Sequence, residues 1–506
     1  MPEEKSFGSQ LRKFRRLKGL SQFQLGTLLG VSDRAVSKWE NNLAKPKSDL
    51  LVKLCEYLDV TSDELLEIHI DSNLYSTRGF GDYKQFWHAM HSLLLDRYGP
   101  TLSLDILSRY EKEKSAFYNT NLPQLFSLFA MLRKEADEHG HGFEVLGGIG
   151  GSFLAFLLGA TDINPLPPHY YCPVCKSVEF ITSIKDGWDL PLKSCSCCGE
   201  LLQRDGHGIP FEVFGRSITQ NTSFDVMLDR QFYGTAETLL TDFFDNYSLI
   251  IVDNPHLLFR KKLSSQAVTI VLITDSHYRT VERIHENLSC AQFSVITAHR
   301  PCINLLFDDY YDAFISLRNR ALGLCESLDY TDNQLYTMLQ NSQSAAIPMF
   351  VLEEFQDILR TNKPSAFSDL LHIFGVALIF AEYPSYKSML KCNGWSVHEI
   401  IVYRDDVYQL ARDKLREHNC MDSALAYMIM NDVRTGSFFR NGINDVSRAV
   451  LKSIGFSDDT ITLLRRTPFL FPKSTGLIYL KRALGMMWYQ RYLGIVPNPD
   501  NSDSLL

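Results

Sequence analysis

Apolar residues near the start of the chain recur at helical spacing and predict a bundle of short helices over residues 7–68. Leu11 and Phe14 share one face of the first predicted helix, and Gly19 after them is a typical helix stop. Ser21 then stands where a helix cap is expected, directly before a leucine-rich segment. The pattern therefore predicts two helices with a break at Gly19.

A tight turn and a third predicted helix follow. Gly30 can adopt a positive φ, and Ser32 is placed to cap a helix over residues 33–41 that buries Val36 and Trp39. A short helix, a tight turn and another short helix form the geometry that places the second helix in the major groove of DNA. The residues expected to face outward from it are Arg34, Ala35, Ser37 and Lys38.

The hydrophobic pattern of the remaining chain is partly strand-like and partly helical. Continuous apolar runs at 248–252 and 268–273 predict buried strands, whereas residues 341–492 repeat apolar positions at helical spacing. The apolar stretch 145–160 is shorter than a membrane span and holds five glycines, so it predicts buried core. We therefore expect an α+β body joined to an all-α head.

Basic and acidic residues are distributed unevenly along the chain, and this distribution indicates a class of function. The 506 residues carry a formal net charge of -8, with 45% hydrophobic and 22% charged residues, as in ordinary folded proteins. Residues 5–53 nevertheless hold eleven Lys or Arg against three Asp or Glu. A basic head on an acidic body indicates that the head binds a polyanion such as DNA. No secretory signal is expected at the N-terminus.

Two CxxC motifs, separated by 19 residues, predict a metal site in the body. Four thiolates at this spacing can enclose one tetrahedral zinc ion, and because sulfur would fill every position the zinc is expected to be structural. The predicted ligands are Cys172, Cys175, Cys195 and Cys198, with Cys197 as an alternative in the second motif.

Two more residues belong to this region. Gly199 follows the second motif and eases its turn. His207 lies in a polar loop soon after, and a lone histidine in such a loop is more typical of the protein surface than of a metal ligand. Disulfides are not expected, because clustered cysteines in a chain without an export signal more often hold metal.

The head resembles the Cro/repressor (XRE) type of helix-turn-helix proteins. The resemblance is carried by LSQFQLGTLLGVSDRAVSKWENNLAKP at 20–46, by a leucine-rich helix at 50–58 and by VTSDELLE at 60–67. It implies that Gln22 contacts a DNA phosphate and that Ser32, Arg34, Ala35, Ser37 and Lys38 face double-stranded DNA. The alternative is a helical bundle that binds another protein and whose basic face is merely solvated.

From about residue 93 onward the chain resembles the alpha subunit of PolC-type bacterial DNA polymerase III. The resemblance is carried by DRYGPTLSLDILSRYEKEK, INPLPPHYYCPVC, DLPLKSCSCCG, YMIMNDVRTG and FLFPKSTGLIYLKRAL, in the family's order. It implies a palm of the nucleotidyltransferase type, in which three aspartates hold two divalent metal ions, with a zinc ribbon inserted into it.

The aspartates of such a palm are incomplete in this chain. Asp225 matches the first residue of the family's Asp-x-Asp pair, but Met227 occupies the second position. A thioether is a poor ligand for Mg²⁺, which prefers oxygen. The third aspartate best matches Asp309, with Asp308 as the alternative. Asp225 and Asp309 are thus vestigial catalytic candidates, and Mg²⁺ is expected only if polymerase activity survives.

The phosphate-binding loop of the family is altered as well. Residues 144–148 stand in place of its Gly-Ser-Arg-Gly-Ser, so that Leu146 replaces a phosphate-pairing arginine and Glu144 adds a carboxylate. Both changes oppose triphosphate binding. The glycines here still permit close backbone approach, although helix packing explains them equally well. Further on, Thr475 replaces a histidine of the family.

The basic residues near the end of the chain allow a second nucleic-acid surface. Aromatic residues alternate with them, as in single-strand binding surfaces, but such residues also simply solvate amphipathic helices. The residues concerned are Arg465, Arg466, Lys473, Lys481 and Arg482.

The sequence therefore predicts an α+β multidomain protein with a division into five parts. These are the helix-turn-helix head (1–68), a linker (69–82), a degenerate palm (83–340, zinc ribbon at 170–206), a helical PolC-like region (341–492) and a disordered tail (493–506).

The predicted function is sequence-specific DNA binding, as a transcriptional regulator with a pseudoenzyme body. The alternatives are a DNA-directed DNA polymerase tethered to DNA by its head, and an interaction protein that mimics a replicase subunit. The expected partners are double-stranded DNA, a second copy in a homodimer and a replication-machinery component, and no membrane. The expected location is the bacterial cytoplasm, at the nucleoid.

Overall fold

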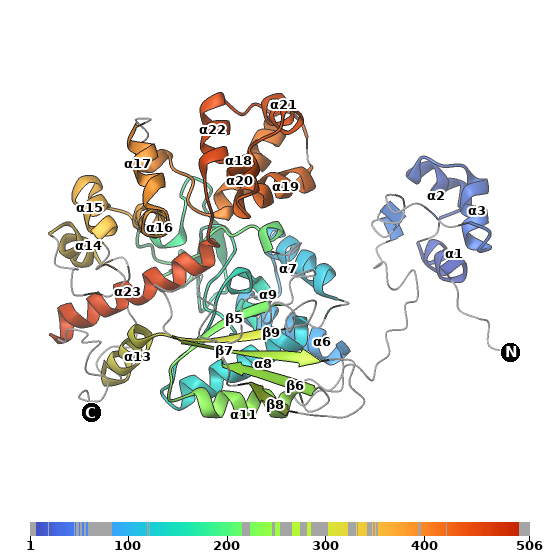
Figure 1. Ribbon diagram of the computed structural model, residues 1–506. Coiled ribbons are helices and arrows are strands. Elements are labelled where there is room, and N and C mark those ends of the chain that lie inside the picture. Colours follow the sequence, from blue (N-terminus) through green and yellow to red (C-terminus); the bar gives the residue numbers. More distant parts are fainter. Residues whose placement is uncertain are drawn as a thin grey trace. The chain divides into compact units, whose positions relative to one another are not determined.

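In the computed structural model the chain forms two compact units, a head made by the described residues up to 58 and a body made by those from 84 onward (Figure 1). The predicted linker at 69–82, the 60–67 segment and the tail from 495 lie outside the described residues. The structure describes residues 7–18, 20–44, 46, 50, 53–54, 57–58, 83–118, 120, 122–214, 223–244, 248–253, 266–273, 281–284, 302–321, 330, 332–341, 347, 350, 353–392, 396–420 and 422–494.

The head is the predicted helical bundle. Its helices are α1 (Phe7–Leu17), α2 (Gln22–Leu29) and α3 (Asp33–Glu40). All three contribute to one apolar core, together with two leucines that follow them in the chain. The buried residues of this core are Phe7, Leu11, Leu25, Leu29, Val36, Trp39, Leu54 and Leu58.

The body is built around a mixed sheet in the strand order β1-β5-β9-β7-β6-β8. Within it β5 runs parallel to β9 and β6 parallel to β8, while the other neighbours are antiparallel. The strands at 248–253 and 266–273 confirm the two predicted apolar runs. The strands are β1 (Phe143–Val145), β5 (Ser223–Leu228), β6 (Ser248–Asp253), β7 (Gln266–Ile273), β8 (Val281–Ile284) and β9 (Cys302–Phe307).

Helices from the first part of the body pack around the sheet (Figure 1). One of them, α8, packs against both β1 and α11. The stretch 145–160 is largely buried, as its composition predicted. The helices are α6 (Tyr83–Tyr98), α7 (Leu104–Phe117), α8 (Leu122–Glu138), the 3-10 turn η2 (Gly148–Gly151), α9 (Phe153–Leu157), α11 (Tyr233–Phe243) and α13 (Asp309–Ala321).

A small three-stranded antiparallel sheet carries the two CxxC motifs. Its order is β3-β2-β4, with β2 in the centre. Its core is made by Tyr170, Cys172, Leu190, Cys195 and Leu202. The elements are β2 (His169–Tyr171), β3 (Val178–Phe180), the 3-10 turn η3 (Gly187–Asp189) and β4 (Gln203–Asp205).

The last part of the chain is helical, as predicted. Its final helix is buried nearly all round and packs against η2, α13, α14 and α16, so it joins the helical region to the sheet. The elements are α14 (Asn333–Gln340), α15 (Glu353–Asn362), α16 (Phe367–Glu382), α17 (Pro384–Cys392), η6 (Val397–Glu399), α18 (Arg404–Glu417), α19 (Ser423–Arg434), α20 (Ser437–Asn441), α21 (Asp445–Ser453), α22 (Asp458–Arg466) and α23 (Lys473–Leu493).

The described residues thus combine an all-α head with an α+β body, as the sequence predicts. Among the described helices, none has the length and apolarity needed to cross a membrane.

Candidate functional sites

The turn between α2 and α3 has the predicted chemistry. Gly30 ends α2 in the left-handed conformation, with φ +68°. The Ser32 hydroxyl accepts a hydrogen bond from the Ala35 N–H at 3.3 Å and caps α3. Gly26 is close to the turn, since a Cβ there would lie 2.8 Å from the Val31 carbonyl oxygen. These contacts fix the angle at which α3 leaves α2.

The described structure leaves the outer face of α3 available to a ligand. Ser32, Arg34 and Lys38 are exposed, whereas Ala35 and Ser37 are half-buried. Val36 and Trp39 point into the core, as the helical spacing predicted. The face therefore presents two cations, a hydroxyl and small side chains, a set that can reach both phosphates and base edges.

The side chain of Gln22, one of the residues predicted to contact DNA, is engaged within the head. Its side-chain amide donates to the Glu40 carboxylate at 2.7 Å. Glu40 also accepts from Arg15, at 2.5 and 3.0 Å, and from Arg12 at 3.3 Å. The sequence did not single out this cluster, which ties α1, α2 and the end of α3 together. A glutamate at the end of the third helix, with two arginines three residues apart on the first helix, was the available signal.

Glu40→Ala is expected to destabilise the head by about 3–5 kcal/mol, because Arg15 would remain buried without its partner. Hydrogen exchange of the full-length protein, read on peptides from α1 to α3, measures the loss. Arg16→Ala is the matched control, since Arg16 is exposed on the same helix as Arg15. Equal protection in Glu40→Ala and Arg16→Ala would contradict the assignment of this cluster as a stabilising one.

The same cluster predicts acid sensitivity. Burial alone would raise the pKa of Glu40, but the hydrogen bonds from Arg15 and Gln22 and the charge of Arg15 lower it. The stability contributed by a carboxylate with a lowered pKa is present above its unfolded pKa, about 4.3 for glutamate, and is lost as the pH falls through the folded value. The head of the natural protein should therefore lose protection below about pH 4.

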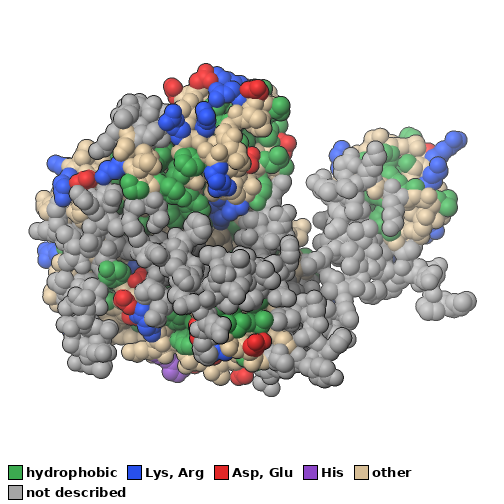
Figure 2. All heavy atoms as spheres, viewed as in Figure 1, with side chains coloured by type: hydrophobic (Ala, Val, Ile, Leu, Met, Phe, Trp, Pro, Cys, Tyr) green, Lys and Arg blue, Asp and Glu red, His purple; other side chains and the backbone are tan. Residues whose placement is uncertain are grey.

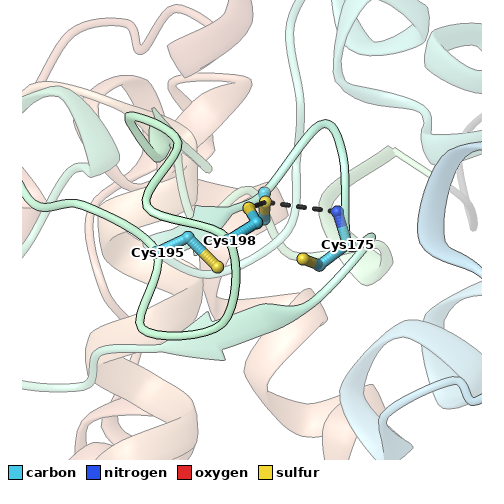
Figure 3. A group of neighbouring side chains, drawn as sticks. Cys175, Cys195 and Cys198 are labelled. Carbon is cyan, nitrogen blue, oxygen red and sulfur yellow. Dashed lines mark hydrogen bonds between the residues drawn. The ribbon is translucent and has the colours of Figure 1, made fainter.

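The four predicted cysteines lie together (Figure 3). Their sulfur atoms all lie within 4.8 Å of one another, and the Sγ atoms of Cys172 and Cys198 are 3.6 Å apart. Zn–S bonds of about 2.3 Å in a tetrahedron place sulfurs about 3.8 Å apart, so the cluster has the size of a Cys₄ metal site. Cys197 is exposed and lies outside this group. The cluster can hold a metal ion such as zinc.

The two motifs form the same turn. The carbonyl of Cys172 accepts from the N–H of Lys176, and that of Cys195 accepts from the N–H of Gly199, both at 2.9 Å. The residue that closes each turn is left-handed, with φ +60° at Lys176 and φ +79° at Gly199. The sequence indicated this conformation only at the glycine, because a lysine rarely adopts it.

The prediction of an exposed His207 is wrong. His207 is 1% exposed, and its Nδ1 lies 3.0 Å from Oδ2 of the fully buried Asp186. Burial by itself would raise the pKa of Asp186, but His207 and Lys473 lower it. The Lys473 ammonium also donates to the His207 carbonyl at 2.5 Å. Because α23 brings Lys473 to this loop, the histidine is a structural residue of the interior.

Asp225 and Asp309 each contact a residue of another segment. Register pairs Asp225 of β5 with Asn304 of β9, and the Asn304 amide donates to the Asp225 carboxylate at 2.7 Å. Asp309 comes after the end of β9, at the start of α13, where it forms an ion pair of 2.6 Å with Arg230. An amide of β9 therefore lies directly beside Asp225 in the sheet.

An arginine covers the Met227 position. From α23, Arg482 donates to the Met227 sulfur at 2.8 Å and to the Glu144 carboxylate at 3.0 and 2.5 Å. Arg482 is 5% exposed, and Glu144 is the direct partner of Met227 in the pairing of β1 with β5. Burial raises the pKa of Asp308 to about 6, against the lowering effects of the Tyr310 N–H and Arg482. A buried cation thus faces the strand on which metal ligands were expected.

The glycine loop is packed by α23. Ser474 donates to the Gly147 carbonyl at 2.6 Å, and the Gly147 N–H donates to Thr475 at 3.2 Å. A Cβ on Gly148 would lie 2.7 Å from Phe214, so this glycine is required for close packing. Leu146 is buried. Close packing thus accounts for Gly148, whereas Gly147 has φ +73° and open space around a Cβ built on it.

Among the described residues, the cysteine cluster is the only group of three or more His, Cys, Asp or Glu side chains positioned to hold a metal ion. The sequence pointed to Asp225 and Met227, named Arg482 only as part of a basic surface, and missed Asn304. The partner of Arg482 is 338 residues away in the chain, so no local pattern signals this contact.

The predicted second basic surface is not formed as a set. Lys473 and Arg482 are engaged inside the body, and Lys481 forms an ion pair with Asp162. Arg465 and Arg466 are exposed. Three of the five residues therefore stabilise contacts of α23, and two face outward.

The head is basic, and its capped helix α3 presents an exposed polar face. These features define the class of the protein as a DNA-binding head joined to a separate α+β body. Comparison with known proteins agrees with this division: residues 11–65 match the family model described as helix-turn-helix. Most of the chain is similar to PolC-type DNA polymerase III, so the protein has a helix-turn-helix head and a polymerase-like body.

Three relatives illustrate the similarity of the body. DNA polymerase III PolC-type from Ureaplasma parvum is 24% identical over 465 residues, covering 78% of this chain and 31% of the relative. The proteins of the same name from Thermotoga maritima and Bacillus cereus are 23% and 22% identical, covering 78% and 85% of this chain. The chain spans about a third of the length of these relatives, at 31%, 33% and 34%.

Proposed function

We propose that this protein is a sequence-specific double-stranded DNA-binding protein, a transcriptional regulator, whose polymerase-derived body no longer catalyses nucleotidyl transfer. The observation that carries the proposal is the contrast between the two units. The face of α3 is exposed and bears Arg34 and Lys38, whereas the strand with Asp225 and Met227 faces the buried Arg482.

The electrostatics of the sheet support the loss of catalysis. Two-metal catalysis needs a cluster of oxygen ligands around a pair of divalent cations. Here a thioether replaces one ligand, and the guanidinium 2.8 Å from it pairs with Glu144, so that this nearby carboxylate is engaged as well. Asp225 is also held by Asn304 rather than by a second acid. In this proposal the body is a palm domain that has lost its catalytic activity.

The proposal extends to the cysteine cluster, which we assign as a structural zinc ribbon. Sulfur fills all four positions, so no position is left open for a substrate. The ribbon stabilises the loops that lead to Asp186 and His207. The domain bounds at 68, 82, 340 and 492 and the ligand set are part of the same proposal.

Heads of this geometry typically read paired half-sites, so the proposal includes a homodimer on DNA. It places the protein at the nucleoid of a bacterial cytoplasm. A replication-machinery partner belongs to the alternative of a replicase mimic.

Arg34→Ala is expected to weaken binding of the selected operator by about 1–3 kcal/mol if Arg34 contacts a base edge. The operator is first selected from random duplexes with the full-length protein, and binding is then measured by fluorescence anisotropy. Arg320→Ala is the control, because Arg320 is exposed on α13 in the body. Equal losses on operator and random DNA would make Arg34 a phosphate contact. Selection of no sequence at all would contradict the proposed function.

A further inference from the structure

Three arginines in the C-terminal helical region are exposed and without a carboxylate partner among the described residues. They are Arg440 of α20 and Arg465 and Arg466 at the end of α22. Their neighbours on α21 differ, because Arg448 and Lys452 both form ion pairs with Asp458. The three guanidiniums therefore offer uncompensated charge in a protein whose formal net charge is -8.

The fold brings Arg440 and Arg465 to the two ends of one short helix, and Arg466 follows Arg465 at the end of α22. The short helix α20 lies between Gly436 and Gly442, both left-handed with φ +68° and +75°. A Cβ on Gly436 would lie 3.2 Å from Arg440 Nη1 and 2.7 Å from the Pro468 carbonyl oxygen, while one on Gly442 would lie 3.9 Å from Arg465 Nε. The end of α22 thus packs against α20, and the guanidiniums of Arg440 and Arg465 flank that short helix.

The local composition is basic. Residues 434–466 hold six Lys or Arg and three Asp or Glu. Figure 2 shows Lys and Arg side chains, interspersed with Asp and Glu, over the upper part of the body, where Figure 1 places α18 to α22. Phe439, beside Arg440 in the chain, is 50% exposed. The surface combines unpaired guanidiniums with an exposed aromatic ring.

We propose that Arg440, Arg465 and Arg466, the arginine surface, bind the phosphate backbone of duplex DNA outside the site that the head occupies. The inference rests on the proposed function of the head. Guanidinium groups match phosphate geometry bidentately, and three uncompensated ones suit a polyanion. Duplex DNA is favoured as the occupant because a head bound to DNA holds the body near the same duplex at high effective concentration.

The test compares the full-length protein with the Arg440→Ala/Arg465→Ala/Arg466→Ala variant on two duplexes. One carries the selected operator alone, and the other carries it between flanks that the body can reach. The natural protein should bind the longer duplex more tightly and with the steeper salt dependence. The variant should lose this gain, with the slope of log K against log salt reduced by about 0.9 per lost phosphate contact. Its affinity for the operator alone should be unchanged.

The Arg448→Ala/Lys452→Ala variant is the matched control, since its two cations already have an anionic partner. It should bind both duplexes as the natural protein does. A triple variant that keeps the gain from the flanks would overturn the proposal, and so would one that loses affinity equally on both duplexes. Unchanged DNA binding with a lost acidic protein partner would also overturn it.

Failure of the proposed function gives a different result. If no operator is selected, the head is not sequence-specific, but the arginine surface can still be assessed on random duplexes with the Arg34→Ala variant as background. A reduced salt slope in the triple variant would then support the surface alone. An unchanged slope would overturn it. Zinc content and thermal unfolding of each variant establish that the body is folded.

Discussion

The full-length protein, mixed with primed template and all four deoxynucleotides, is expected to leave the primer unextended in either Mg²⁺ or Mn²⁺. Each step of nucleotidyl transfer in a two-metal site depends on metal ions held by oxygen ligands. Met227 supplies sulfur, and Arg482 lies 2.8 Å from that sulfur. Metal catalysis contributes several kcal/mol, and each 1.36 kcal/mol is tenfold in rate, so the expected loss is several powers of ten.

Two variants sharpen this prediction. Met227→Asp alone should not restore extension, because the new carboxylate would pair with Arg482 rather than with a metal ion. Met227→Asp combined with Arg482→Met removes that competitor, and it should bind Mn²⁺ more tightly than the single variant. Extension by the natural sequence that disappears in Asp225→Ala would establish the alternative, a polymerase tethered to DNA by its head.

Removal of the zinc ion that we propose for the cysteine cluster is the second change with a large expected effect. Structural Cys and His sites bind zinc with an apparent free energy of roughly 10–16 kcal/mol at neutral pH. This binding free energy contributes directly to the free energy of folding. Cys172→Ser and Cys198→Ser should therefore lower the zinc content from one ion per chain and abolish hydrogen-exchange protection over β2 to β4. The cause is the small core of this sheet, to which Cys172 and Cys195 themselves contribute.

Cys197→Ser is the control for the zinc prediction. Cys197 is exposed and lies outside the group of four sulfurs. That variant should retain one zinc ion per chain by metal analysis. If Cys198→Ser retained zinc and Cys197→Ser lost it, Cys197 rather than Cys198 would be the fourth ligand.

Local patterns predicted the head with little error, because its structure depends on short-range chemistry. Ser21, Gly30 and Ser32 act within three or four residues of their own position, as caps and as a left-handed turn. The outward position of Arg34 follows from helical spacing. The Glu40 cluster could not be derived in this way, since Arg15 and Glu40 are 25 residues apart in the chain.

The body shows where local pattern is insufficient. The CxxC spacing indicated four ligands, but which cysteine of the second motif joins the group depends on how the turn at Gly199 orients each sulfur. His207 was placed at the surface because its neighbours are polar. Its burial depends on Asp186 and on Lys473, which is 266 residues further along the chain.

By itself the sequence determined the helices of the head, the apolar strands of the body, the four clustered thiols and the methionine at position 227, which offers no oxygen ligand. The tertiary structure decided what surrounds that position: β9 brings Asn304 to Asp225, and α23 brings Arg482 to Met227 and Glu144. It also decided which cations are buried, since Lys473 and Arg482 are engaged inside while Arg440 and Arg465 are exposed beside α20. The physical reason is that capping and periodicity act over a few residues, whereas the partner of a buried charge is set by packing between distant segments.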